Sequence, residues 1–237
     1  MILAAGGPVI PNFGQGSSCE QTNGWFCTDW LRAHWGDTLQ PALVQHIWLS
    51  LIALAIGFVI AFALALVGFR YRLFDAPIGA FADFLYTIPS LALFQLLVPF
   101  TGLTVTTVEI ALVSYTLLIL YRNMVEGLRT VPPDVLEAAR GMGLTQTQTF
   151  IRVELRLAMP TIVAGLRIAA VSTISIATVA AFVIPKGLGY PIFIALGQDL
   201  FKTEILAAGA LAVGLALLTD ALLAYTTRLV TPWLRAG

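Results

Sequence analysis

Hydrophobic residues along this chain are grouped into long runs that charged residues seldom interrupt. A helix needs about 20 residues to cross a hydrocarbon core roughly 30 Å thick. Five runs approach that length, near Ile47–Phe69, Pro77–Phe100, Leu103–Tyr121, Thr161–Ile184 and Ile205–Tyr225. The pattern predicts an all-α membrane protein with about five transmembrane helices.

The second run is the least regular, since it contains Asp83, Pro89 and Pro99. Lipid cannot satisfy the backbone groups that a proline frees, so this span is predicted to be kinked or partly buried in protein. The kink at Pro89-Ser90 is a candidate gate, in which the Ser90 hydroxyl helps to satisfy the freed carbonyls. A static kink is an equally good interpretation of the same two residues.

Composition excludes an ordinary soluble domain. Hydrophobic residues make up 58% of the chain and charged residues 11%, with a mean hydropathy of +0.88, whereas soluble domains hold about half and a quarter of these classes. The net charge is zero, so nothing points to a nucleic-acid partner. His34 and His46 are far apart, and no metal site is predicted. The apolar opening residues lack the basic segment that is typical of a signal peptide.

The distribution of basic residues predicts the orientation. Of the thirteen lysines and arginines, only Arg32, Lys186 and Lys202 lie on the side opposite the segment that follows the third run. Because cytoplasmic loops carry an excess of Lys and Arg, the N-terminus is predicted to be outside and the C-terminus cytoplasmic. Residues 1–40 would then form a small extracytoplasmic tail before a transmembrane domain at residues 41–237.

The predicted tail contains both cysteines of the chain, Cys19 and Cys27. On the oxidising side of the membrane they are expected to form a disulfide that closes a short loop. Two free thiols in a disordered tail are the alternative.

A charged segment, residues 122–159, separates the third and fourth runs. Pro132-Pro133 stops the preceding helix, and Asp134 is predicted to cap a helix over Val135–Met142. Gly143 would end that helix, because a C-terminal cap often needs a left-handed backbone. Thr145 would then cap a second short helix. Two short helices bent at a glycine are either a connecting loop or a docking element for another protein's groove.

The motif in this segment is more specific. Glu137-Ala138-Ala139, followed by Gly143 and later by Val153-Glu154-Leu155, resembles the EAA loop of permease subunits of bacterial ABC importers of the type I fold. The family's loop ends in Leu-Pro, whereas this chain has Leu155-Arg156 and its proline comes at Pro160. The resemblance covers about residues 42–230 and implies a multi-pass protein of the bacterial plasma membrane. It also implies that the ATPase is contacted by Glu137, Ala138, Ala139, Gly143 and Leu144.

Three further stretches, "QHIWLSLIALAIGFVIAFALAL", "TIPSLALFQLLVPFTGL" and "AAFVIPKGLG", are similar to permeases of osmoprotectant importers. That resemblance implies transport of a quaternary ammonium compound such as glycine betaine, choline or carnitine. Permeases for other small solutes, such as amino acids, are the nearest alternative. The implied partners are a pair of ATP-binding cassette subunits, a second permease chain, identical or paralogous, an extracytoplasmic binding protein and membrane lipid.

The chain is not expected to be an enzyme. It lacks the G-x-x-x-x-G-K-[ST] sequence that cradles nucleotide phosphates, so ATP and Mg are expected in the partner ATPase and no cofactor in this chain. A stand-alone secondary transporter would show paired broken helices from internal repeats, and no convincing repeat is present. A membrane-embedded enzyme finds no support in a His, Cys or paired-carboxylate cluster.

Three ionisable residues within the runs are predicted to share one depth in the inner half of the membrane: Asp83, Arg167 and Asp220. A lone charge there costs at least about 2.5–3.5 kcal/mol, so such residues usually face the protein and pair. Arg167 is predicted to pair with Asp220, Asp83 or both, near the cytoplasmic gate. The alternative is that Arg167 extends to the inner headgroups while Asp83 is hydrated there.

Overall fold

The computed structural model describes residue 19, residues 22–197 and residues 200–231, and these form helices and loops without a strand. Residues 1–18 of the predicted tail lie outside the described residues. In chain order the helices are α2 (Thr28–His34), α3 (Gln40–Arg70), α4 (Arg72–Thr87), α5 (Ser90–Thr101), α6 (Val105–Arg129), α7 (Pro133–Gly141), α8 (Gln146–Thr149), α9 (Leu155–Ala177), α10 (Gly189–Gly197) and α11 (Lys202–Val230).

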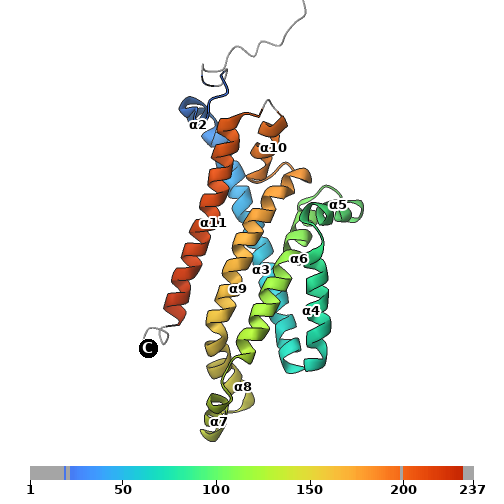
Figure 1. The fold of residues 1–237 in the computed structure, drawn as a ribbon, viewed down its shortest axis with the longest axis vertical. Helices are drawn as coiled ribbons and strands as arrows, with labels where there is room; N and C mark the ends of the chain where they lie inside the picture. Colours follow the sequence, from blue (N-terminus) through green and yellow to red (C-terminus); the bar gives the residue numbers. More distant parts are fainter. Residues whose placement is uncertain (1–18, 20–21, 198–199, 232–237) are drawn as a thin grey trace, which may run out of the picture.

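Four helical segments are long and apolar enough to cross a membrane, and they correspond to four of the five predicted spans. They contain α3, α6, α9 and α11, which run along the length of the molecule in Figure 1. The short helices α7 and α8 lie together at the lower end of this bundle, while α2 and α10 lie at the upper end. The described part is therefore a bundle of long helices with short helices at both ends.

The kink predicted in the second span lies at Pro89, as expected, and is a sharp break. The segment forms two helices, α4 and α5, which meet at an angle of 98°. Pro89 lacks a backbone N–H, and the residue before a proline is driven out of the helical region; Ile88 accordingly has φ −67° and ψ 126°. The Ile88 carbonyl lies in the break and accepts a hydrogen bond from the Tyr115 hydroxyl of α6. A side chain on a neighbouring helix therefore stabilises the break.

Small residues allow the spans to approach closely. On α3 the buried positions include Ala53, Gly57, Ala61 and Ala65, whereas larger side chains such as Val59 face outward. A methyl group added at Gly57 would lie only 1.9 Å from the Thr116 hydroxyl of α6. Close contact between small residues is the typical way in which helices associate in lipid, where apolar burial alone gives little driving force.

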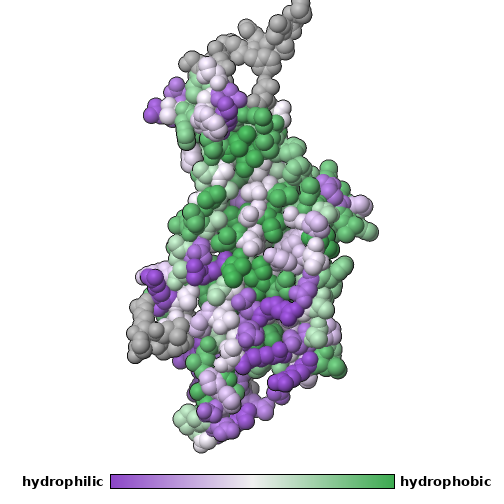
Figure 2. Space-filling view, viewed as in Figure 1, coloured by the Kyte–Doolittle hydropathy of each residue, from purple (hydrophilic) through white to green (hydrophobic). Residues whose placement is uncertain are grey.

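The surface has the division expected of a membrane protein. Figure 2 shows hydrophobic residues over the upper and middle parts of this face and hydrophilic residues gathered towards the lower end. Outward leucines of α11, such as Leu217 and Leu218, are well exposed in the isolated chain. Since the bundle leaves these side chains uncovered, lipid is their natural surrounding.

The helical run that contains α3 begins well before the first predicted span. Thr28–Arg70 form one run of 43 residues, in which a π-helical turn at Trp35–Leu39 joins α2 to α3. The predicted boundary between residues 40 and 41 therefore falls inside this run rather than at a break. Trp30 and Leu39 pack with Ala208 of α11, so the described part of the tail is attached to the bundle.

Candidate functional site

The charged segment forms a compact element at one end of the bundle, with α7 as its most projecting part (Figure 1). Helix α7 begins at Pro133, two residues before the predicted start, and its N-cap residue is Pro132 rather than Asp134. The reason is that the fixed φ of proline suits the first helical position. Asp134 instead lies in the first turn, where its carboxylate still faces the positive end of the helix dipole.

The motif residues of α7 divide between two faces. Glu137 and Ala138 are exposed, whereas Ala139 is only 1% exposed and packs inward. Met142, just beyond the helix, is 73% exposed. The outward face of α7 is therefore short, mostly small or apolar, and available to a partner.

Gly143 makes the turn that ends α7. Its φ of +81° is in the left-handed region, and an added Cβ would meet nothing within 4 Å. The backbone conformation, rather than lack of space, accounts for glycine at this position. Leu144, the next motif residue, donates its backbone N–H to the Ala139 carbonyl at 3.2 Å, which closes the turn against α7.

The second helix of the segment is not separate, contrary to the prediction. Thr145 forms a capping box with Gln148, as expected for an N-cap. From there the chain stays helical through a π-helical turn at Phe150–Glu154 and into α9, so that Gln146–Phe182 are one run of 37 residues. Pro160 lies inside α9 and does not end it.

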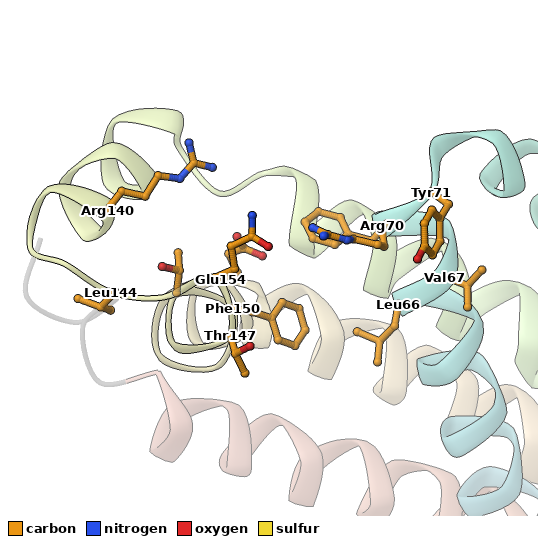
Figure 3. Close-up of a pocket in the computed structure, with 12 residues that line it drawn as sticks. Leu66, Val67, Arg70, Tyr71, Arg140, Leu144, Thr147, Phe150 and Glu154 are labelled. Carbon is orange, nitrogen blue, oxygen red and sulfur yellow. The ribbon is translucent and has the colours of Figure 1, made fainter.

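A groove of about 890 Å³ lies between this segment and the lower end of α3. Figure 3 shows Leu66 and Val67 of α3 on one side, Phe150 and Thr147 on the other, and Arg140 pointing in from α7. Glu154 lies on the Arg140 side of the groove, opposite Arg70. The segment thus stands off the bundle and is joined to it mainly through α6 and α9.

The predicted pairing of Arg167 with Asp220 is confirmed. Nε and Nη2 of Arg167 on α9 donate to the two carboxylate oxygens of Asp220 on α11 at 2.8 and 2.9 Å. This two-point geometry is the strongest form of the arginine–carboxylate interaction. It joins the fourth and fifth spans within the apolar part of both helices.

Asp83, the other partner considered for Arg167, pairs with a different arginine. Asp83 on α4 instead accepts a hydrogen bond from Arg122 on α6. The prediction rested on depth alone, and depth does not say which helices are neighbours. The structure places α4 beside α6, and Gly79 on α4 leaves room for the Arg122 side chain to cross to Asp83.

Sequence reasoning missed a third charged cluster at the lower end of α4 and α6. Asp75 accepts hydrogen bonds from Arg129 at 2.8 Å and from the Tyr121 hydroxyl at 2.7 Å. Asp75 lies just outside the second predicted span, so it was not considered as an intramembrane charge. The signal that could have found it is a single carboxylate close in sequence to Arg70 and Arg72, just before the second predicted span.

The candidate gate residues lie at the break between α4 and α5. Pro89 is the N-cap residue of α5 and Ser90 is its first residue. The Ile88 carbonyl is satisfied by Tyr115, as described above, rather than by Ser90. The break therefore depends on a contact with α6 that the local sequence does not reveal.

At the opposite end, a disulfide joins Cys19 and Cys27. The loop that it closes lies on the first turn of α11. The Thr203 hydroxyl donates to the Gly24 carbonyl at 2.8 Å, and the backbone N–H of Lys202 donates to the Asn23 side chain at 3.0 Å. The loop therefore caps α11 from a position far away in sequence.

His46 is a structural residue rather than a ligand. It is fully buried, with Nε2 3.0 Å from the Ile174 carbonyl and Nδ1 accepting from the Leu188 backbone N–H at 3.2 Å. Nδ1 therefore holds the turn at Gly187, where φ is +75°, while Nε2 ties α3 to α9. Within the described residues, no group of three His, Cys, Asp or Glu is placed to hold a metal ion.

Comparison with known proteins identifies the family. Residues 53–232 match the family described as binding-protein-dependent transport system inner membrane component. The chain belongs to this family. The matched range contains the whole charged segment and all three ion pairs, while the disulfide loop lies before it.

The sequences of two relatives align with most of the permease chain. It is 35% identical over 189 residues to a glycine betaine/carnitine/choline transport system permease protein of Bacillus subtilis, covering 79% of this chain and 86% of the relative. An osmoprotectant import permease protein of Salmonella typhimurium is 34% identical, with 79% and 89% covered. Family membership places the permease in the inner membrane as a transport component rather than a catalytic subunit.

Solved structures agree on the fold. The permease superimposes on a chain of the inward-facing MetNI methionine ABC transporter with a TM-score of 0.71 and 21% identity, covering 84% of this chain and 98% of the other. A second match, to an amino acid ABC transporter, has a TM-score of 0.65 and 18% identity, with 83% and 96% covered. The fold is that of a type I ABC importer permease.

The Arg167–Asp220 pair leads to a testable prediction. Arg167→Leu leaves the Asp220 carboxylate without its partner inside the span, whereas Arg167→Leu with Asp220→Leu removes both charges. We expect the single variant to be less stable and to transport less well than the double variant. Thermal unfolding of the detergent-purified permease and uptake by the assembled transporter measure the two effects.

Arg167→Leu with Asp83→Leu serves as the matched control, since Asp83 pairs with Arg122 and should not rescue the loss. A double variant at Arg167 and Asp220 that performs no better than Arg167→Leu would contradict the assigned pair.

Proposed function

We propose that this permease forms the translocation path for a quaternary ammonium osmoprotectant such as glycine betaine, choline or carnitine. The observation that carries the proposal is its 34–35% identity, over about four fifths of the chain, to permeases named for these solutes. The three solutes share a trimethylammonium group, so a common path chemistry is reasonable. Aromatic rings recognise such a cation best, and we place that recognition in the partner binding protein.

The coupling step is proposed to take place at α7. Its outward residues, Glu137 and Ala138, would enter a groove of a separate ATPase subunit, while Gly143 and Leu144 hold the turn that presents them. A short projecting helix with a small, exposed face suits docking into a groove. Ala139 would support α7 from inside rather than contact the ATPase, because it is buried.

The proposed assembly contains two permease chains, two ATPase subunits and one extracytoplasmic binding protein. ATP and Mg would be bound by the ATPase subunits, with no cofactor in the permease. Five spans, one of them broken, are too few to enclose a conduit, so a second identical or paralogous chain would complete it. The break at Pro89-Ser90 and the charges at Asp83, Arg167 and Asp220 would lie along or beside the path.

The orientation follows from the distribution of charge. With α7 in the cytoplasm, the N-terminal tail at residues 1–40 and the disulfide loop face outward, and the transmembrane domain at residues 41–237 ends inside. Most lysines and arginines then lie on the cytoplasmic side, in agreement with the positive-inside rule.

Uptake by the reconstituted transporter tests the proposed solute. Proteoliposomes that contain the permease, its ATPase and its binding protein should accumulate labelled glycine betaine, choline or carnitine when ATP is supplied to the ATPase. Labelled methionine should not accumulate. Accumulation of an amino acid alone would overturn the solute assignment, and uptake without ATP would point to secondary transport.

Substitution of Gly143 tests whether the charged segment, residues 122–159, couples the permease to its ATPase. Gly143→Val places a β-branched residue in the left-handed region, which costs about 1–3 kcal/mol and should distort the turn. Gly143→Asn is the matched control, because asparagine tolerates this conformation. We expect both variants to insert normally but only the valine variant to lose co-purification with the ATPase and transport. An ATPase that co-purifies equally with both would show that this turn does not position the docking site.

Thiol labelling tests the orientation and the disulfide together. A membrane-impermeant maleimide should not label Cys19 or Cys27 in intact cells, and should label both after mild reduction. Labelling without a reductant would mean that the thiols are free. Labelling only after permeabilisation would reverse the topology.

A further inference from the structure

A partly buried cluster of Asp75, Tyr121 and Arg129 joins the lower ends of α4 and α6. The path and docking roles proposed above do not use it. Asp75, in the first turn of α4, accepts from Nη1 of Arg129 at 2.8 Å and from the Tyr121 hydroxyl at 2.7 Å. Both carboxylate oxygens are thus engaged by α6. The Arg129 and Asp75 side chains are 33% and 28% exposed, so the pair is partly shielded from water.

Helix α3 leaves room for this contact. Gly68 on α3 lies against Tyr121, and an added Cβ would meet the Tyr121 hydroxyl at 2.3 Å. Nη2 of Arg129 also lies 3.4 Å from the Gly68 carbonyl. The absence of a side chain at Gly68 therefore lets the Tyr121 hydroxyl and the Arg129 guanidinium meet Asp75 at the α3–α4 corner.

Arg129 is the last residue of α6, and α7 begins only four residues later. The connection between them is short and held in place. The Thr130 backbone N–H donates to the Glu126 carbonyl at 3.0 Å, and its hydroxyl donates to the Gly127 carbonyl at 3.0 Å. Val131, which follows, is 7% exposed. Thr130 and Val131 are thus held at the end of α6, and only Pro132 separates them from α7.

Helix α4 is attached to α6 at two further levels. Arg122 pairs with Asp83 in the middle of α4, and Tyr115 donates to the Ile88 carbonyl at its upper end, where the chain turns by 98° into α5. The two helices are thereby linked along their length. A movement that enters α4 at Asp75 would reach the break at Pro89.

We propose that Asp75, Arg129 and Tyr121 form a coupling node, in which they are positioning residues that transmit movement of α7 to the broken span α4–α5. This inference rests on the proposed docking of α7 to the ATPase. Breaking the node should leave docking of the ATPase and ATP hydrolysis intact, while α4 and α5 no longer move in response to α7. Mutation of contacts that connect two distant sites can change the coupling free energy between those sites.

The test uses the assembled transporter with Asp75→Asn, Arg129→Gln and Tyr121→Phe. Arg72→Gln is the matched control, because Arg72 is an exposed arginine at the same end of α4. Three quantities are measured: co-purification of the ATPase, ATP hydrolysis stimulated by the loaded binding protein, and glycine betaine imported per ATP hydrolysed. In the node variants we expect normal co-purification and hydrolysis, with import per ATP lowered at least about fivefold. The control should match the unmodified transporter in all three.

A double-mutant cycle examines the ion pair itself. Asp75→Asn with Arg129→Gln should be no more defective than the worse single variant, since each alone already breaks the pair. Multiplicative losses in the double variant would overturn the node. So would unchanged import per ATP in all three single variants, or loss of ATPase co-purification even in Tyr121→Phe, which would make the cluster merely structural.

Different measurements test the docking role of α7 and the coupling node. If the docking role of α7 is wrong, Gly143→Val keeps its ATPase whatever the node variants do. If docking is right and the node is wrong, Gly143→Val loses its ATPase while the node variants keep their import per ATP. The solute assignment is tested separately, by which labelled compound accumulates in the unmodified transporter.

Discussion

A charged side chain in or beside the hydrocarbon layer must find its partner within the protein, and the arrangement of this bundle depends on that constraint. Each ion pair formed by the described residues joins two different helices. Arg167–Asp220 joins α9 to α11, while Arg122–Asp83 and Arg129–Asp75 join α6 to α4. Since an isolated charge would be costly, these pairs specify neighbours in a setting where apolar side chains alone specify little.

Close packing of small residues complements the ion pairs. Gly57 admits the Thr116 hydroxyl, and Gly165 on α9 lies against the Asn123 side chain of α6. Such contacts bring α3 and α9 close to α6, which becomes the central helix of the bundle. Many bulky apolar residues, such as Val59, are left exposed on the outside of the bundle, where lipid can cover them.

Helix α6 is connected both to the broken span α4–α5 and to α7. Its upper half stabilises the break of the second span through Tyr115, and its lower end holds Asp75 and continues almost directly into α7. The element proposed to meet the ATPase and the element proposed to control the path are thus attached to the same helix.

The sequence by itself determined the helical class, four of the spans, the turn at Gly143 and the family, because these depend on local composition, on backbone restrictions and on a short motif. It placed Arg167, Asp220 and Asp83 at one depth but did not determine which would pair. It also predicted a kink at Pro89, but only the tertiary structure decided that this kink is a 98° break. The tertiary structure alone also decided that Asp83 meets Arg122 and that Asp75 belongs to a cluster. The physical reason is that depth follows from position along one helix, whereas partners follow from which helices lie side by side.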